Sequence, residues 1–138
     1  MNIEVRPGVP LDLPAIAQIQ AASPQASQWD PVEYLGYHLL VALAEGRVAA
    51  FAVTRRLAPD ERELLNLAVD LPFRRLGVGR RLLAALTSGY PGVLWLEVRE
   101  SNAVARSFYK SLGFCDAGRR SAYYLPSGET AIVMKLHS

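Results

Sequence analysis

A glycine-containing loop rich in arginine lies near the middle of the chain. Four arginines fall within positions 74–81, and Gly77 and Gly79 lie among them. Glycines allow successive backbone amides to point at one position, and the start of a helix adds partial positive charge there. Arginines beside such amides can contact further phosphate oxygens. The loop therefore predicts a site for a small phosphorylated ligand, and the alternative is a tight turn in which glycine only supplies positive φ.

The loop follows a predicted strand and precedes a predicted helix. Residues 63–69 are largely aliphatic, as in a strand, and leucines at 82, 83 and 86 line one face of a helix that Arg80 opens. Asp30, Pro31 and Glu33 form the start signal of another helix. Similar patterns predict helices over 10–22 and 102–112, strands over 3–5, 39–44, 48–55, 114–124 and 131–136, and a strand buried on both faces over 93–98. Together they predict an α/β fold with helices inserted between the strands of a mixed, mostly antiparallel sheet.

Composition narrows the class of protein. The 138 residues suit one domain over 1–138, and a net charge of +2 argues against a protein that coats nucleic acid. No apolar run approaches the ~18 residues of a membrane span. The single cysteine, Cys115, excludes an internal disulfide and is expected to pack in the core, and two histidines are too few for a metal site. We expect a soluble, cytoplasmic protein without a metal ion, a nucleic-acid partner or a membrane partner.

Three kinds of phosphate loop can be compared with this one. A P-loop has lysine and then serine or threonine after its second glycine, where this chain has Arg80 and Arg81. A dinucleotide fingerprint has a third glycine where this chain has Leu82, although Glu97, 20 residues beyond Gly77, keeps that alternative open. The third pattern, Arg-x-x-Gly-x-Gly after a strand that ends at Val69-Asp70, fits best.

Further segments in the same order carry a resemblance to a known family. They are Asn66-Leu67-Ala68-Val69-Asp70, Leu94-Trp95-Leu96-Glu97-Val98-Arg99, Ser101-Asn102-Ala103 and Phe108-Tyr109-Lys110-Ser111-Leu112-Gly113-Phe114. With the glycine loop they resemble the GNAT superfamily of N-acetyltransferases, in particular its RimI-type branch, which acetylates the N-terminal alanine of a ribosomal protein. The resemblance is strong over residues 62–136 and weak over the first third of the chain, and it implies the GNAT fold, in which the central strands splay apart.

The resemblance implies acetyl-CoA as the cosubstrate, bound where two neighbouring parallel strands splay apart. It assigns the pantetheine arm to the backbone of Leu67, Ala68 and Val69. It assigns the pyrophosphate to Arg75, Leu76, Gly77, Val78, Gly79 and Arg80. Asn102 would contact the cofactor through its side chain, and the alternative role for this asparagine is a helix cap.

The resemblance also implies direct attack of an amine on the thioester, with no covalent enzyme intermediate. Glu97 would be the general base, through water, and Tyr109 the general acid. The alternatives are a carboxylate paired with an arginine such as Arg99, and an aromatic core residue. Glu63 lies where other members of the superfamily carry their base, so it could assist or replace Glu97.

The implied acceptor is the N-terminal α-amine of a protein or peptide. Trp29 and Tyr34 match one wall of the family's acceptor site, and Tyr123 and Tyr124 match the other. The chain has Thr130 after Glu129 where the family usually has an acid, which bears on peptide specificity. A small-molecule amine or a lysine side chain is the alternative acceptor, and an acyl-CoA-binding sensor without turnover is the alternative class.

Overall fold

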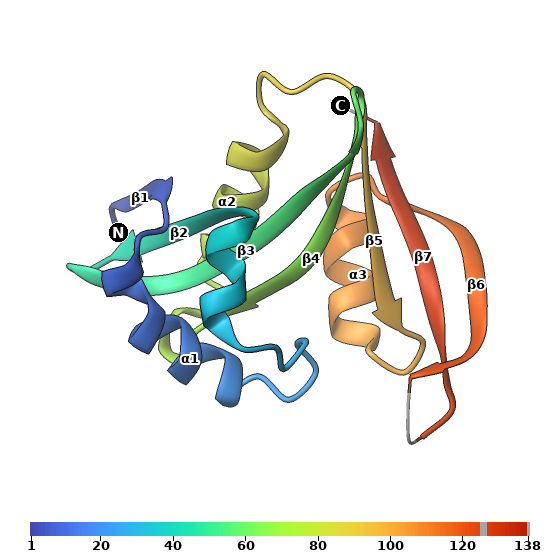
Figure 1. Cartoon of the computed structure of the whole chain (residues 1–138), viewed down its shortest axis with the longest axis horizontal. Coiled ribbons are helices and arrows are strands. Elements are labelled where there is room, and N and C mark those ends of the chain that lie inside the picture. The colour runs from blue at the N-terminus through green and yellow to red at the C-terminus, as the bar shows by residue number, and fades with distance from the viewer. Residues whose placement is uncertain (125–126, 138) are drawn as a thin grey trace. The chain divides into compact units, whose positions relative to one another are not determined.

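The protein is described by a computed structural model that covers residues 1–124 and 127–137 (Figure 1). Its strands and helices, in chain order, are β1 (Ile3–Pro7), α1 (Leu13–Ala21), β2 (His38–Ala44), β3 (Arg47–Ala58), β4 (Glu61–Val69), α2 (Val78–Thr87), β5 (Val93–Arg99), α3 (Ala103–Ser111), β6 (Cys115–Tyr124) and β7 (Glu129–His137). Three short 3-10 helices are η1 (Pro10–Asp12), η2 (Pro31–Gly36) and η3 (Leu71–Phe73).

The strands are hydrogen-bonded in the order β1-β2-β3-β4-β5-β7-β6. β4 and β5 pair in parallel, whereas β1 with β2, β2 with β3, β5 with β7 and β6 with β7 pair antiparallel. The parallel register runs from Glu61↔Val93 to Leu64↔Leu96, four residue pairs of a nine-residue β4. The predicted mixed, mostly antiparallel sheet is confirmed.

The chain divides into two compact units. The first unit contains Met1–Arg55 and Leu65–Ser88, and the second contains Arg56–Leu64 and Gly89–Ser138. The expectation of one domain over 1–138 remains a prediction.

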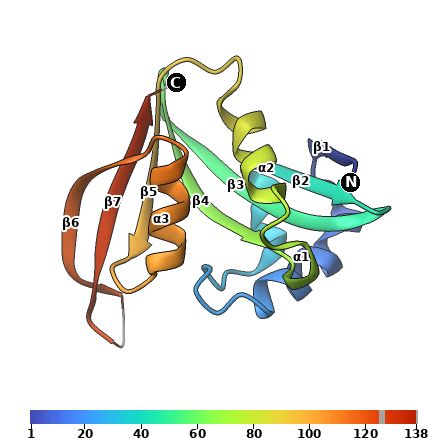
Figure 2. The same ribbon diagram turned by 180° about the vertical axis from the view of Figure 1, so that it is seen from behind.

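Helices cover both faces of the sheet in the first unit. Figures 1 and 2 show α1 and α2 on opposite sides of β2 and β3. Side chains alternate between the faces of a strand, and β2 is buried along most of its length, while β3 is buried over residues 49–54. The core cluster on one face consists of Ile16, Ile19, Tyr34, Leu39, Val41, Phe51, Val53 and Ala68.

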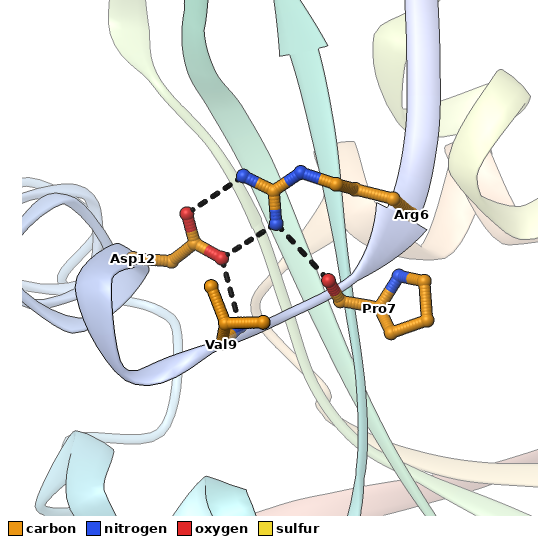
Figure 3. A network of polar contacts seen from close by, with 4 residues as sticks. All are labelled: Arg6, Pro7, Val9 and Asp12. Carbon is orange, nitrogen blue, oxygen red and sulfur yellow. Dashed lines mark hydrogen bonds and ion pairs between the residues drawn. The ribbon is translucent and has the colours of Figure 1, made fainter.

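The first unit begins with an ion pair that fixes the turn after β1 (Figure 3). The guanidinium of Arg6 donates to both carboxylate oxygens of Asp12, at 2.8 and 2.9 Å, and to the Pro7 carbonyl oxygen. Asp12 also accepts from the Val9 backbone N–H at 2.8 Å. The hydrogen bond from Arg6 outweighs burial and lowers the pKa of Asp12.

In the second unit, α3 runs alongside β5 in both views (Figures 1 and 2). Leu94, Leu96 and Val98 of β5 are buried, and the residues between them are half-buried. The strand therefore alternates, and the prediction that it is buried on both faces is wrong. Its half-buried face carries polar residues, Glu97 among them.

Three further expectations are corrected. The signals at Asp30 and Pro31 start a helix, but it is the six-residue 3-10 helix η2. The helix after the glycine loop begins at Val78 rather than Arg80. Cys115 is exposed, because β6 is an edge strand of the sheet, so its predicted place in the core is wrong.

Within the described residues, no helix has both the length and the hydropathy of a membrane span. Among the same residues, His, Cys, Asp and Glu side chains form no group of three that could hold a metal ion.

Candidate active site

The glycine loop of the first unit is anchored at its start by Phe73 and Arg74. Phe73 is buried, and the Arg47 guanidinium lies 4.8 Å from the centre of its ring. Arg74 Nε donates to the Val69 carbonyl oxygen at 2.9 Å, and its Nη2 donates to Ser23 Oγ at 3.1 Å. The first arginine of the Arg-x-x-Gly-x-Gly pattern thus braces the loop.

The centre of the loop has the backbone shape of an anion-binding turn. Arg75 and Gly77 have left-handed conformations, with φ of 63° and 84°, and α2 begins at the next residue, Val78. Left-handed residues beside right-handed ones turn successive N–H groups toward one point, and the first N–H groups of a helix have no intrahelical acceptor. A Cβ added at Gly77 would meet no atom within 4 Å. The loop can thus present its amides to a phosphate.

The remaining residues predicted for the cosubstrate in this unit lie in the loop, in the first turn of α2 and in β4. Leu76 is exposed and Gly79 is buried in the first turn of α2, while Arg80 is exposed. Ala68 is buried in the core cluster, with Leu67 and Val69 half-buried on either side of it. The backbone of β4 at these positions stays the predicted contact of the pantetheine arm.

In the second unit, Glu97 lies close to Arg120 and Tyr123. Arg120 Nε is 3.3 Å from Glu97 Oε1, and the Glu97 side chain is 17% exposed. The Arg120 guanidinium also lies 5.1 Å from the centre of the Tyr123 ring. Partial burial, with the charge of Glu97 and a hydrogen bond to it, raises the pKa of Tyr123. A predicted catalytic carboxylate and a predicted acceptor-binding tyrosine therefore meet in one cluster.

The arginine that pairs with Glu97 differs from the one suggested by the sequence. Arg99 pairs with Glu129 at 3.6 Å, and Glu129 also accepts from the Ser101 backbone N–H at 2.7 Å. Arg120 comes from β6 and reaches Glu97 of β5 across β7, which separates the two strands. No spacing in the sequence indicates this pairing, because it depends on the register of three strands.

Glu63 lies on the same face of the sheet as Glu97. Glu63 pairs with Trp95 in the parallel register, and Glu97 lies two residues along β5 from Trp95. The charge of Glu63 also contributes to the raised pKa of Tyr123, as a smaller cause than Glu97. The charges of the two candidate bases therefore both raise the pKa of Tyr123.

The two predicted residues of α3 have different surroundings. Asn102 caps the helix, since its Oδ1 accepts from the Ala105 N–H at 3.2 Å. Tyr109 is buried, with the rings of Phe108 and Phe114 each 5.4 Å away. Burial raises the pKa of Tyr109, so its phenol is protonated at neutral pH. Contact of Asn102 or Tyr109 with a cosubstrate remains a prediction.

The predicted acceptor residues of the first unit are Trp29 and Tyr34. Trp29 is 41% exposed, whereas Tyr34 is fully buried, and its hydroxyl donates to Gln20 Oε1 at 2.5 Å. In this conformation the Tyr34 side chain points into the core and its hydroxyl is bonded to Gln20. Contact between Tyr34 and a substrate stays a prediction. The side chain of Tyr124 lies outside the part of the molecule that the structure describes.

Comparison with known proteins gives a consistent picture. The model of the Acetyltransferase (GNAT) family matches residues 12–114. The chain is 43% identical over 136 residues to [Ribosomal protein bS18]-alanine N-acetyltransferase of Salmonella typhimurium, covering 91% of this chain and 90% of that protein. It is 37% identical over 105 residues to N-alpha-acetyltransferase RimI of Mycobacterium tuberculosis, covering 73% of this chain and 66% of that protein.

Solved structures agree with the sequence comparison. The ribosomal-protein-S18-alanine N-acetyltransferase of Escherichia coli has a TM-score of 0.81 at 36% identity, covering 99% of this chain and 94% of that chain. Ard1 from Thermoplasma volcanium has a TM-score of 0.88 at 28% identity, covering 99% of this chain and 98% of that chain.

Proposed function

The chain belongs to the GNAT family of acetyltransferases, and we propose that it transfers the acetyl group of acetyl-CoA to the N-terminal α-amine of a protein. The observation that carries the proposal is its similarity, over nine-tenths of both chains, to an enzyme named for N-acetylating an alanine of ribosomal protein bS18. The proposed acceptor is accordingly the N-terminus of a ribosomal protein, met in the cytoplasm.

The glycine loop is the proposed pyrophosphate site. GNAT acetyltransferases use acetyl-CoA as their cosubstrate. The left-handed turns at Arg75 and Gly77 and the first N–H groups of α2 are suited to phosphate oxygens, and the open space beside Gly77 leaves room for them. Arg75 and Arg80 would add charge-assisted contacts. The backbone of 67–69 would bind the pantetheine arm, with Asn102 as a further contact.

The proposed reaction is a direct displacement at the thioester carbonyl. The amine nitrogen forms a bond to the acetyl carbon, the carbon–sulfur bond breaks, and the amine loses a proton while the sulfur leaves as a thiolate. Glu97 would accept the proton through a water molecule, since its partly exposed carboxylate is accessible from the half-buried face of β5. Glu63 is the alternative base on the same face.

Tyr109 would act on the leaving sulfur. A thiol has an ordinary pKa of about 8.5, and burial raises the pKa of the Tyr109 phenol above its usual value. Complete proton transfer from this phenol to the thiolate would therefore be uphill. A hydrogen bond from the hydroxyl to the developing thiolate carries no such cost, and it stabilises the charge where it forms.

An α-amine suits this machinery better than a lysine side chain. An α-amine with a pKa of about 7.7–8.0 is roughly 10–15% neutral at pH 7, whereas a lysine amine near 10.4 is about 0.04% neutral. A carboxylate that acts through water therefore has to deprotonate a smaller fraction of an α-amine than of a lysine amine. The pairing of Glu97 with Arg120 also reduces the negative charge that would attract a lysine amine, which is almost wholly protonated at pH 7.

The test is acetylation of matched peptides, read by mass spectrometry. One peptide has a free N-terminal alanine and no lysine, the second is blocked at its N-terminus and has an internal lysine, and a polyamine is the third acceptor. We expect transfer to the free alanine peptide only. Faster acetylation of the blocked peptide or of the polyamine would assign the enzyme to lysine side chains or small amines instead.

A further inference from the structure

A buried asparagine joins β4 to the chain between α1 and η2. Asn66 is 6% exposed, and its carboxamide pairs with both peptide groups of Ser27. The Ser27 N–H donates to Asn66 Oδ1 at 3.3 Å, and Asn66 Nδ2 donates to the Ser27 carbonyl oxygen at 3.0 Å. The Asn66 side chain thus supplies Ser27 with the two backbone hydrogen bonds that a neighbouring strand would supply in a sheet.

The same carboxamide is fixed from the other side by two buried residues. Asn66 Nδ2 lies 3.0 Å from the Tyr34 hydroxyl and 3.3 Å from Gln20 Oε1, and Tyr34 donates to that same oxygen. Gln20 is 5% exposed and Tyr34 is fully buried. Buried polar groups are costly unless they are paired, so this network permits few arrangements of its members.

The network extends along the segment that it holds, residues 22–30. Gln20 Nε2 donates to the Trp29 carbonyl oxygen at 2.6 Å. Gln28 Nε2 lies within 3.1 Å of the carbonyl oxygens of Gln20, Ser23 and Ala26. Side chains therefore satisfy the backbone of an irregular segment, which otherwise would have no regular partner.

We propose that Asn66 is a positioning residue for the acceptor. Through Ser27 and Gln20 it sets the backbone on which Trp29 presents its 41% exposed side chain. This inference rests on the proposed function and on the prediction from the sequence that Trp29 forms one wall of the acceptor site. Asn66 also directly precedes the stretch of β4 proposed for the pantetheine arm. Because Asn66 is itself buried, we expect it to position the acceptor wall without contacting either substrate.

The kinetic test compares Asn66→Ala with Ile16→Ala. Ile16 belongs to the core cluster beside Tyr34, so its truncation loosens the same core without removing a polar contact. We expect Asn66→Ala to raise the KM for the alanine peptide about tenfold or more, with kcat and the KM for acetyl-CoA changed less than about threefold. Ile16→Ala should leave all three constants within about twofold of wild type, at a temperature where both variants are folded.

Hydrogen exchange of the intact protein supplies a readout that does not depend on activity. We expect residues 22–30 to exchange faster in Asn66→Ala than in wild type, and at the wild-type rate in Ile16→Ala. If Asn66→Ala does not fold, Tyr34→Phe removes only the hydroxyl that Asn66 and Gln20 share, and a smaller change in the same two readouts is expected.

Each outcome bears on one of the two proposals. Unchanged exchange of 22–30 in the Asn66 and Tyr34 variants overturns the positioning role, whatever the acceptor is. Faster exchange with an unchanged acceptor KM, or an equal rise of KM in Ile16→Ala, overturns it as well. A wild-type enzyme that acetylates lysine or a polyamine but no N-terminus overturns the proposed function instead, and the KM comparison is then made with that amine.

Discussion

Arg120 Nε lies 3.3 Å from Oε1 of Glu97, although β7 separates the strands that carry the two residues. The Tyr123 ring lies against the same guanidinium, and Tyr123 is also hydrogen-bonded to Glu97. The carboxylate that we propose as the base is thus held by two residues of β6 and remains 17% exposed. A held carboxylate with some access to water is suited to relaying a proton through a water molecule.

The first prediction concerns the choice between the two carboxylates. We expect Glu97→Gln to lower kcat on the order of 10²–10⁴-fold, because the amide cannot accept the amine's proton. The loss of kcat in Glu97→Gln should become smaller as pH rises, because more of the α-amine is then neutral without a general base. Steady-state rates over a range of pH, with acetyl-CoA affinity by calorimetry, provide the measurement.

Glu63→Gln is the matched control, since it makes the same change on the same face of the sheet. We expect its kcat to stay within about tenfold of wild type, as for a residue that assists but does not replace the base. A nearly inactive Glu63→Gln beside an active Glu97→Gln would move the base to Glu63.

The second prediction tests the glycine loop. Gly77→Asp places a carboxylate beside the amides proposed for the pyrophosphate, and we expect no CoA binding to be detectable by calorimetry. Gly46→Asp is the control, because Gly46 also has positive φ (76°) and open space beside it but lies in the β2–β3 turn. The two variants should lose similar stability, and only the first should lose CoA. Equal CoA affinity would remove the loop from the cosubstrate site.

The elements that the sequence predicted best are those with a strong local signal. The strands expected over 39–44 and 48–55 correspond to β2 and β3, and Glu45 and Gly46 both have positive φ in the turn between them. The start of η2 was also visible, because Asp30 caps it, but a cap marks where a helix begins and not how long it is. Of its apolar residues only Tyr34 is buried, while Val32 and Leu35 are exposed, so no apolar stripe extends the helix.

The candidate site was predictable where its residues are close in the sequence. The glycine loop is one continuous segment, so its spacing alone indicated a phosphate site. The partners of Glu97 and Asn66 come from distant segments, and their contacts depend on strand register and on the path of residues 22–30. Hydrophobic periodicity carries no information about such polar contacts, which is why Arg99 was named as the arginine that Glu97 would pair with in its alternative role, and why Asn66 had no expected role.

The third prediction uses the Arg6–Asp12 pair of Figure 3. The pKa of Asp12 is lower in the folded protein than its ordinary value of 3.8, with the hydrogen bond from Arg6 as the largest cause. The stabilisation is therefore fully present above the unfolded pKa and is lost as pH falls through the folded pKa. We expect Asp12→Asn to lower the free energy of unfolding by about 1–2 kcal/mol at pH 7, the modest size reflecting the partly exposed Arg6.

The measurement is urea unfolding of both proteins at several pH values. The difference between wild type and Asp12→Asn should narrow below about pH 4. Glu4→Gln, which removes an exposed carboxylate from the same strand, should change stability by less than about 0.5 kcal/mol at any pH. A difference for Asp12→Asn that persists undiminished at the lowest pH would show that its cause is not the ionised pair.

The last prediction separates the hydroxyl of Tyr109 from its ring. The ring packs between Phe108 and Phe114, with both centres 5.4 Å away, and Tyr109→Phe preserves that packing. We therefore expect a melting temperature close to that of wild type and an unchanged affinity for CoA. Turnover should fall on the order of 10²-fold or more, because the thiolate would leave without a hydrogen-bond donor. Release of CoA at saturating peptide, followed with a thiol reagent, measures the rate, and Tyr37→Phe, at an exposed tyrosine, is the control. Turnover of Tyr109→Phe within twofold of the control would make Tyr109 a core residue with no part in the reaction.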